Sequence, residues 1–264
     1  METADVVIIG GGPCGLSAAM ELKNAGFKAI VIEKGNVVNA IYKYPTHQTF
    51  FSTSERLSIG GIPFITEERK PKRNQALVYY RNAVTLSGID VRPYETALTV
   101  EKDDDFLVTT TKGVYRSKYL VAATGYYDQP NNLSVEGADL PKVMHYFKEG
   151  HPYFNQDVLV IGGKNSAVDA ALELHKAGSR VTVSYHGTSY SKSIKPWILP
   201  EFDGLVRKGE IQMLFDSMVD RITEGAVELT VDDQKKFIKN DFIFAMIGYH
   251  PNYDFLGSLG IKID

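Results

Sequence analysis

The 264 residues of the chain are enough for two modest domains, each with its own hydrophobic core. A charged content of 23% and a net charge of −3 are ordinary for a soluble globular protein and give no reason to expect nucleic acid or a membrane as a partner. No run of 18 apolar residues and no basic leader occurs, and the single cysteine excludes an internal disulfide. We therefore expect a protein of the reducing cytosol, and the absence of a Cys/His cluster predicts no metal site.

The first half of the chain alternates strands and helices. We predict a strand at 5–9, a helix from about Pro13 to Ala25, a strand at 28–33, a loop without helical period at 41–57, a helix from Pro71 to Gly88, and strands at 89–92, 97–101, 106–111, 114–116 and 119–123, the last of them buried. The second half opens at Asp157 and repeats this order, with a helix near 201–208 and a last strand at 241–247. A Pro-, Gly- and Asn-rich stretch at 125–155 separates the halves.

The two halves share a duplicated segment. Residues 6–35 align without a gap onto residues 158–187, with twelve identities among the thirty positions. Each copy reads as an apolar strand, a glycine turn, an amphipathic helix and a second apolar strand. This βαβ pattern is typical of a unit that binds a dinucleotide pyrophosphate, so two such copies favour electron transfer between two dinucleotides.

The first copy contains an intact G-x-G-x-x-G motif at Gly10, Gly12 and Gly15. In such a motif the first glycine permits the tight turn, the second lets phosphate approach the backbone, and the third lets helix and strand pack closely. The helix N-terminus supplies free N–H groups to the pyrophosphate. Glu33 ends the second strand and is placed to accept hydrogen bonds from a ribose diol.

The second copy departs from this motif in two places. Lys164 replaces the second glycine in the run Gly162, Gly163, Lys164, Asn165, Ser166 and Ala167. Tyr185 takes the position of Glu33, so the pocket no longer repels a ribose 2′-phosphate. Nearby groups that are positive or can become so are Arg180, His186, Lys192 and Lys195, although the two lysines can equally be solvated loop charges. This copy therefore favours NADP(H) over NAD(H).

Cys14 lies inside the first glycine turn, at the first turn of the helix. A helix N-terminus favours the thiolate, whereas the pyrophosphate expected at the same place opposes it. The residue is therefore either a redox nucleophile or a small side chain that fits a tight turn. His47 and His145 receive no catalytic role, because a lone loop histidine is more often structural.

Several long motifs carry a resemblance to a known family. The segments GGGPCGLSAA, YPTHQTFFSTS, ATGYY, IGGKNSAVDAALEL and AMIGYHP resemble the FAD-dependent bacillithiol disulfide reductases, which are thioredoxin-reductase-like flavoproteins, and the match covers essentially the whole chain. The resemblance implies an α/β fold with two Rossmann-like, three-layer (ββα) dinucleotide-binding domains in tandem. It places an FAD domain at 1–125, an NADPH domain at 126–248, and the start of a return to the first domain at 249–264. Because family members continue for several tens of residues, the chain resembles a form that lacks the C-terminal segment.

The resemblance also implies an enzyme that uses NADPH and FAD to reduce bacillithiol disulfide through Cys14. The expected FAD contacts are Gly10, Gly12, Pro13, Cys14, Gly15, Glu33, Lys34, Tyr44, His47, Gln48, Ala97, Ala123, Thr124 and Gly125. The expected NADPH contacts are Gly162, Gly163, Lys164, Asn165, Ser166, Ala167, Tyr185, His186, Lys192, Lys195 and Gly248. His186 stands where the family leads us to expect arginine.

Other functions fit part of the same sequence. A flavin monooxygenase also uses two such domains, and a ferredoxin-type NADP reductase is closer in fold. The absence of a C-x-x-C motif argues against a thioredoxin reductase. A non-catalytic NADP(H)-binding redox sensor is the alternative outside enzymes, and the sequence leaves open whether the chain forms a homo-oligomer.

Overall fold

The computed structural model describes residues 1–262, which form two compact units. The first unit comprises Met1–Gln129 and the chain from Tyr249 onward, and the second comprises Pro130–Gly248. The chain passes from the first unit to the second after Gln129, four residues beyond the boundary predicted from the sequence. Residues 126–129 stay with the first unit because Tyr127 packs on Tyr44, with ring centroids 4.9 Å apart, and Asp128 pairs with Lys43 at 2.7 Å. The expected return segment lies within the first unit, apart from its last two residues, which fall outside the described residues.

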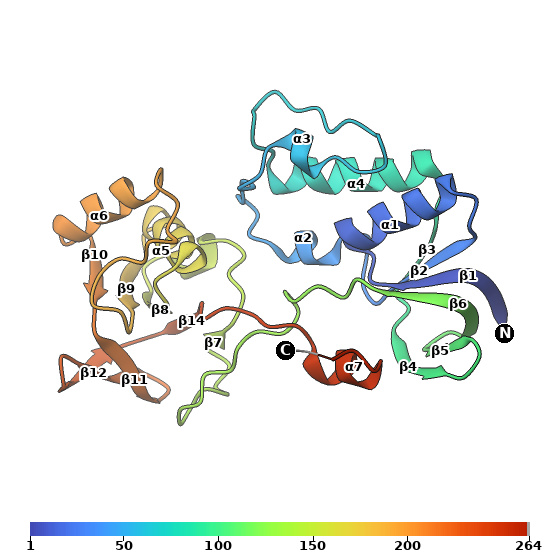
Figure 1. Cartoon of the computed structure of the whole chain (residues 1–264). Coiled ribbons are helices and arrows are strands. Elements are labelled where there is room, and N and C mark those ends of the chain that lie inside the picture. The colour runs from blue at the N-terminus through green and yellow to red at the C-terminus, as the bar shows by residue number, and fades with distance from the viewer. Residues whose placement is uncertain (263–264) are drawn as a thin grey trace. The chain divides into compact units, whose positions relative to one another are not determined.

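The first unit is built on a six-stranded sheet with the order β3-β2-β1-β6-β5-β4 (Figure 1). Its strands are β1 (Glu2–Ile9), β2 (Ala29–Glu33), β3 (Asp90–Pro93), β4 (Ala97–Lys102), β5 (Phe106–Thr110) and β6 (Val114–Ala122). The strands β3, β2, β1 and β6 are parallel, whereas β5 and β4 add an antiparallel ribbon. Its helices are α1 (Pro13–Asn24), α2 (Asn39–Lys43), α3 (Ser54–Leu57), α4 (Arg73–Ser87) and α7 (Tyr253–Ser258).

Two sequence-based expectations for this unit are wrong. The segment 41–57 is not a plain loop, because the short helices α2 and α3 begin and end it; each is too short to show a hydrophobic period. The predicted strands at 114–116 and 119–123 are one strand, β6, and its second half is not fully buried: Tyr119 is 59% exposed. The reason is that β5 pairs with β6 only as far as Ser117, so beyond this residue β1 is the only neighbour in the described sheet.

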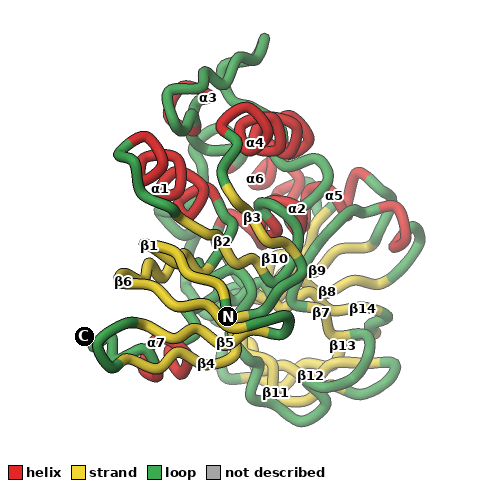
Figure 2. The backbone as a smooth tube through the Cα atoms, turned by 90° about the vertical axis from the view of Figure 1, so that its right-hand side faces the viewer, coloured by secondary structure: helices red, strands yellow, loops and turns green. Residues whose placement is uncertain are grey.

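The second unit contains a five-stranded parallel sheet with the order β10-β9-β8-β14-β7. Its strands are β7 (Val143–Met144), β8 (Asp157–Ile161), β9 (Arg180–Ser184), β10 (Ile211–Leu214) and β14 (Phe242–Ala245). An antiparallel sheet of β11 (Ser217–Ile222), β12 (Ala226–Val231) and β13 (Gln234–Lys239) covers one face of it (Figure 2). The helices are α5 (Asn165–Lys176) and α6 (Leu199–Arg207), with a 3-10 turn, η1, at His151–Tyr153.

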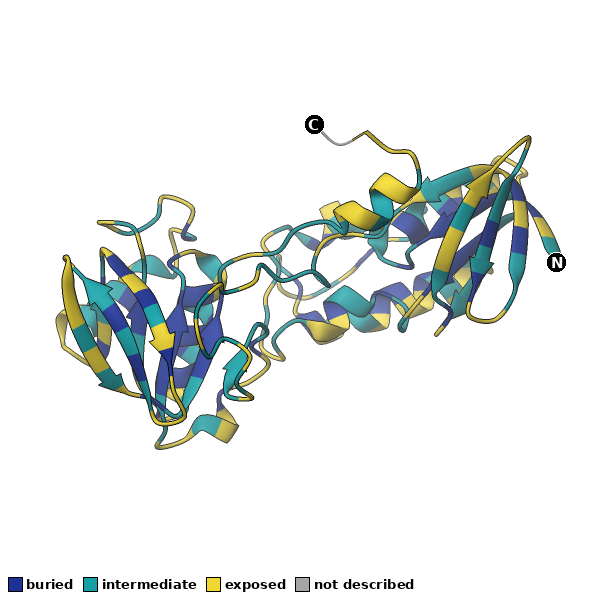
Figure 3. Cartoon of the chain, turned by 90° about the horizontal axis from the view of Figure 1, so that it is seen from below, coloured by how far each residue is buried: buried dark blue, intermediate teal, exposed yellow. Residues whose placement is uncertain are grey.

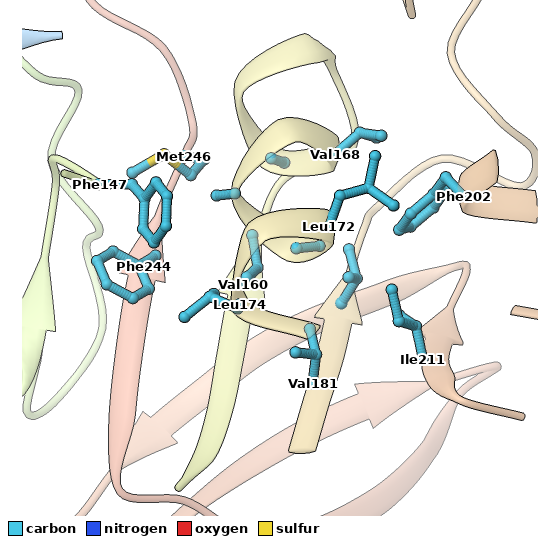
Figure 4. Close-up of a cluster of buried hydrophobic side chains, with 14 of the residues drawn as sticks. Phe147, Val160, Val168, Leu172, Leu174, Val181, Phe202, Ile211, Phe244 and Met246 are labelled. Carbon is cyan, nitrogen blue, oxygen red and sulfur yellow. The ribbon is translucent and has the colours of Figure 1, made fainter. Parts of the chain in front are cut away.

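The core of the second unit follows from the period of α5. Its buried apolar side chains lie on two sides of the helix: Leu174 lies beside Val160 and Phe244, whereas Val168 and Leu172 lie on the side of Phe202 (Figure 4). The central strands β8, β9 and β14 are mostly buried, and buried residues are dark blue in Figure 3. This layer of helix, parallel sheet and antiparallel sheet is the three-layer arrangement predicted for each copy.

Two expected absences can be compared with the described residues. None of the helices within residues 1–262 is long and apolar enough to cross a membrane. The same residues bring no three His, Cys, Asp or Glu side chains together in a group that could hold a metal ion.

Candidate functional site: two dinucleotide cradles

The glycine turn of the first unit joins the end of β1 to the start of α1. Gly10 has φ +115°, and a Cβ on it would overlap the Ala123 carbonyl oxygen at the end of β6. A Cβ on Gly15 would overlap the Gly10 carbonyl oxygen, so only glycine lets α1 come this close to the strand. A Cβ on Gly12 would meet nothing within 4 Å. The three glycines thus have three different geometries, and the space beside Gly12 is where a phosphate can approach the backbone.

The Glu33 carboxylate is fixed under this turn. It is 7% exposed, and it accepts hydrogen bonds from the Gly11 N–H at 2.6 Å and from the Gly35 N–H at 2.7 Å, one on each oxygen. Each carboxylate oxygen has a further lone pair, so these contacts leave acceptor capacity for a ribose hydroxyl. The predicted contact of Glu33 with the ribose stays a prediction.

Cys14 is the second residue of α1, after Pro13, and its side chain is exposed. The Tyr80 phenol is nearby and donates a hydrogen bond to the Leu57 carbonyl oxygen at 3.0 Å. Burial raises the pKa of Tyr80 far above the usual value for tyrosine, and Tyr79 and Cys14 raise it further. Tyr80 is therefore a neutral phenol.

The loop after α2 carries the predicted flavin contacts Tyr44, His47 and Gln48. Arg73, the first residue of α4, holds this loop in place: its backbone N–H donates to the Gln48 carbonyl oxygen at 2.8 Å and its Nη2 donates to the Tyr42 carbonyl oxygen at 2.5 Å. Arg73 is 6% exposed, and its Nε is buried without a hydrogen-bond partner. Sequence reasoning did not single out Arg73, because a basic residue at a helix start gives no signal of a long-range contact.

Tyr44 is largely enclosed by other aromatic rings. Its ring centroid lies 4.9 Å from that of Tyr127 and 6.0 Å from that of Phe50. Burial, followed by the neighbouring Tyr126 and Tyr249, raises the pKa of Tyr44. From the sequence, the aromatic side chains of this loop could either stack on a flavin ring or pack under a surface loop. The contacts of Tyr44 with Tyr127 and Phe50 are packing contacts within the protein.

Lys34 lies one residue beyond Glu33 and reaches the linker. Its ammonium is 3.0 Å from Asp128, which also pairs with Lys43 at 2.7 Å. Although burial alone would raise the pKa of Asp128, hydrogen bonds from Lys43 and Lys34 lower it overall. Lys34 and Lys43 therefore anchor the chain where it leaves the first unit, a role that the sequence did not indicate.

The remaining predicted FAD contacts divide into two groups. Ala123, whose N–H donates to the Ile9 carbonyl oxygen at 2.8 Å, lies with Thr124 and Gly125 directly after β6, beside the glycine turn. Ala97 instead lies at the start of β4 and packs in the cluster that contains Leu120 and Phe255. The structure therefore brings the segment after β6, but not Ala97, to the turn.

The second unit repeats the turn between β8 and α5. Gly162 has φ +131°, and a Cβ on it would lie 2.5 Å from the Met246 carbonyl oxygen, which mirrors the contact of Gly10. Ala167 stands where the first copy has its third glycine and is buried. Lys164 precedes the helix with its side chain exposed. The Tyr185 ring lies against Gly163, where any Cβ would overlap it.

The segment 191–195 lies at the start of α5. Asn165 accepts a hydrogen bond from the Lys195 N–H at 2.8 Å and donates one to the Ser193 carbonyl oxygen at 2.9 Å. The Lys195 ammonium pairs with Asp169 of α5 at 2.8 Å, so its charge is already matched. Lys192, Ser166 and His186 are exposed, and Gly248 follows β14 with φ +97°.

The expectation that Arg180 lies near a 2′-phosphate is wrong. Arg180 begins β9 and pairs with Asp157 at 2.5 Å, whereas Tyr185 follows the other end of that strand. In a parallel sheet the dinucleotide is bound at the carboxyl ends of the strands, so a residue at the start of β9 lies at the wrong edge.

Comparisons with known proteins agree with this geometry. The family model of the pyridine nucleotide-disulphide oxidoreductases matches residues 7–264. The chain belongs to this family. It is 60% identical over 261 residues to the bacilliredoxin reductase Bdr of Bacillus subtilis, covering 98% of this chain and 81% of that protein.

Solved structures give the same result. The bacillithiol disulfide reductase Bdr of Staphylococcus aureus is 60% identical and superposes with a TM-score of 0.98, covering 100% of this chain and 82% of that one. Thioredoxin reductase of T. acidophilum, at 20% identity and a TM-score of 0.80, shares the fold. The predicted α/β fold and the resemblance to bacillithiol disulfide reductases are thus confirmed.

The chain is accordingly a flavoprotein disulfide oxidoreductase whose cofactors are FAD and NADPH. The glycine turn at Gly10–Gly15 together with Glu33 forms the first cradle. This cradle fits FAD, because the space beside Gly12 admits phosphate and Glu33 closes the turn with a carboxylate. The second cradle, formed by the turn at Gly162, the start of α5 and Tyr185, fits NADPH, because it keeps the strained turn, no side chain caps α5, and Tyr185 replaces the carboxylate.

Proposed function

We propose that the protein uses NADPH to reduce a low-molecular-weight disulfide, bacillithiol disulfide, by way of the Cys14 thiolate. The observation that carries this proposal is the position of the chain's single cysteine: its thiol is exposed, on the first turn of the helix that faces the FAD pyrophosphate site. A thiol that served only as a small turn residue would not need to be accessible.

The residues that hold FAD are those of the first cradle. The turn at Gly10, Gly12 and Gly15 receives the pyrophosphate, Glu33 receives the ribose, and the loop fixed by Arg73 presents His47 and Gln48 to the ring system, with Tyr44 packed behind them among other aromatic rings. Pro13 starts α1 with its backbone already constrained to a helical φ, at a position whose N–H would have no partner within the helix. When bound, FAD supplies two electrons that it takes as hydride from NADPH.

The residues that hold NADPH are those of the second cradle. The start of α5, from Lys164 to Ala167, receives the pyrophosphate. Because Lys195 is paired with Asp169, we assign the ribose 2′-phosphate to Lys192 and His186, whose side chains are exposed. His186 contributes a full charge only when it is protonated.

Cys14 performs the exchange with the substrate. Its thiolate attacks one sulfur of the disulfide, a bond forms between Cys14 and that sulfur, and the second thiolate leaves. Two electrons and a proton then cleave this mixed disulfide, which releases the second thiol and restores Cys14. The sum is one disulfide, one NADPH and one proton consumed, and two thiols and one NADP⁺ formed.

The names of the relatives point to two sizes of substrate. One relative is named for bacillithiol disulfide and the other for bacilliredoxin, a redoxin protein. We favour the small disulfide, because Cys14 lies within the turn that receives FAD, where a small molecule reaches the thiol more readily than a folded protein does. A protein disulfide is the second candidate.

The test is turnover of the Cys14→Ala variant. We expect its NADPH consumption with bacillithiol disulfide to fall to the level without substrate, while NADPH still bleaches the flavin absorbance at the normal rate. The wild type assayed with an oxidised redoxin separates the two substrates. Normal disulfide turnover by Cys14→Ala would overturn the covalent step, and turnover with the redoxin alone would overturn the choice of substrate.

A further inference from the structure

Val38 has a backbone conformation that is costly for its type of side chain. It is a fully buried, β-branched residue with φ +51° and ψ +46°, which is the left-handed region. Such an outlier is kept only where surrounding contacts hold it, and it often marks a functional position. Its position is close to the first cradle, since it directly precedes α2.

One contact joins this residue to the first cradle. The Val38 N–H donates to the Gly11 carbonyl oxygen at 2.9 Å, while the Gly11 N–H donates to Glu33. Both polar groups of Gly11 are therefore fixed, its N–H by the last residue of β2 and its C=O by the segment that follows. This leaves the peptide between Gly11 and Gly12 without freedom to rotate.

The fixed peptide determines where the next donor points. The peptide bond is planar and trans, so its C=O and N–H point in opposite directions. With the Gly11 carbonyl turned toward Val38, the Gly12 N–H points away from that segment. Gly12 is also a residue at which an added methyl group would meet no protein atom within 4 Å.

We propose that Val38 is a positioning residue for FAD: its left-handed backbone, through the bond to Gly11, orients the Gly12 N–H toward the pyrophosphate before FAD binds. The inference rests on the assignment of FAD to the first cradle. A donor that is already oriented costs no reorganisation when the anion arrives, so the bound cofactor is retained longer.

Among residues 1–262, the second cradle has no counterpart of the hydrogen bond between Val38 and Gly11. Gly163 and Tyr185 align with Gly11 and Glu33, and Tyr190 stands at the same offset of 152 from Val38, three residues beyond the aligned segment. Within the described residues, no hydrogen bond joins the Tyr190 N–H to Gly163, and the Tyr190 hydroxyl donates to Asp203 instead. A fixed cradle suits a resident cofactor, and an unfixed one suits NADPH, which must exchange in every catalytic cycle.

The test compares side-chain volume with backbone geometry at position 38. Val38→Gly and Val38→Ala keep the N–H and adopt positive φ more readily, but they remove buried side-chain atoms. Val38→Pro removes the N–H and forbids positive φ. We measure the thermal midpoint of each variant and the rate at which FAD fluorescence appears when the holoprotein is diluted.

We expect Val38→Gly and Val38→Ala to lower the thermal midpoint and yet to release FAD within about threefold of the wild-type rate. Val38→Pro is expected to release FAD about tenfold faster, which corresponds to the loss of one hydrogen bond. If Val38→Pro does not fold, the Gly and Ala variants still test the competing explanation, that the buried side-chain volume of Val38 and not its backbone bond retains FAD. FAD release that accelerates in step with the lost side-chain volume would overturn the proposal, whereas a wild type that retains no FAD would overturn the assignment of the cradle itself.

Discussion

The Lys195 ammonium lies 2.8 Å from the Asp169 carboxylate, and this ion pair ties the segment 191–195 to α5. Lys195 is only 11% exposed in its side chain, so it is a structural residue in the absence of coenzyme. Lys192 lies three residues earlier with its side chain in solvent. Lys195 therefore stabilises the segment and Lys192 is available to a ligand, a difference that the sequence alone did not predict.

Coenzyme preference should separate these lysines. We expect Lys192→Ala to raise the KM for NADPH by about tenfold, the equivalent of about 1.4 kcal/mol, and to leave the KM for NADH unchanged, because only NADPH carries the 2′-phosphate. Lys195→Ala should lower the thermal midpoint and affect both coenzymes alike. A greater loss of NADPH preference in Lys195→Ala than in Lys192→Ala would contradict the assignment.

The second and third glycines of the first cradle should fail in different ways. Gly12→Ala adds a methyl group where there is space and where φ is −77°, so we expect little bound FAD and a thermal midpoint equal to that of the wild-type apoprotein. Gly15→Ala forces α1 away from Gly10 and should cost about 3 kcal/mol of unfolding free energy. The measurements are thermal unfolding and flavin content after purification. Equal stability losses in both variants would argue against this division of roles.

The Arg73 side chain should be needed for the order of the loop that carries Gln48. Arg73→Met leaves the Tyr42 carbonyl without its charged donor, and we expect a loss of about 2 kcal/mol of unfolding free energy. Hydrogen exchange in residues 42–50 should accelerate. Arg81→Met, an exposed arginine on the same helix, is the matched control and should change neither quantity. Unchanged exchange in Arg73→Met would show that the backbone bond to Gln48 suffices.

Much of this arrangement was predictable because it follows from local sequence. The glycine turn, the Ala-Gly helix end and the two apolar strands specify each βαβ unit within thirty residues. The pattern occurs twice in the chain, so each copy supports the interpretation of the other. The contacts that refine the site are of another kind. Lys195 meets Asp169 across 26 residues and Arg73 meets Tyr42 across 31, and no spacing rule predicts such pairs. The left-handed backbone of Val38 was likewise unpredictable, since valine disfavours it.

An ion-pair cluster at the start of β8 should make the stability of the second unit depend on pH. The Arg180 side chain, assisted by Lys239, lowers the pKa of Asp157 to about 2. A carboxylate whose pKa is lowered on folding contributes stability above its unfolded pKa of about 4, and this contribution is lost as the pH falls toward 2.

We therefore expect Asp157→Asn to be less stable than the wild type by about 1 kcal/mol at pH 7, a value reduced by the exposure of both basic partners. The difference should shrink below about pH 4. Urea unfolding at pH 7, 5 and 3.5 measures it, with Asp104→Asn in the exposed turn as the control. A difference that is the same at all three pH values would rule out the ion pairs as its cause.

The most direct test of the whole account is the intact mass of the protein after it meets its substrate without NADPH. Because Cys14 is the only cysteine, mixing the oxidised holoprotein with bacillithiol disulfide should add the mass of one bacillithiol, release one equivalent of thiol, and leave Cys14→Ala unmodified. Subsequent NADPH should remove the added mass and release the second thiol. An unmodified wild-type protein that nevertheless turns over the disulfide at its normal rate would contradict the account.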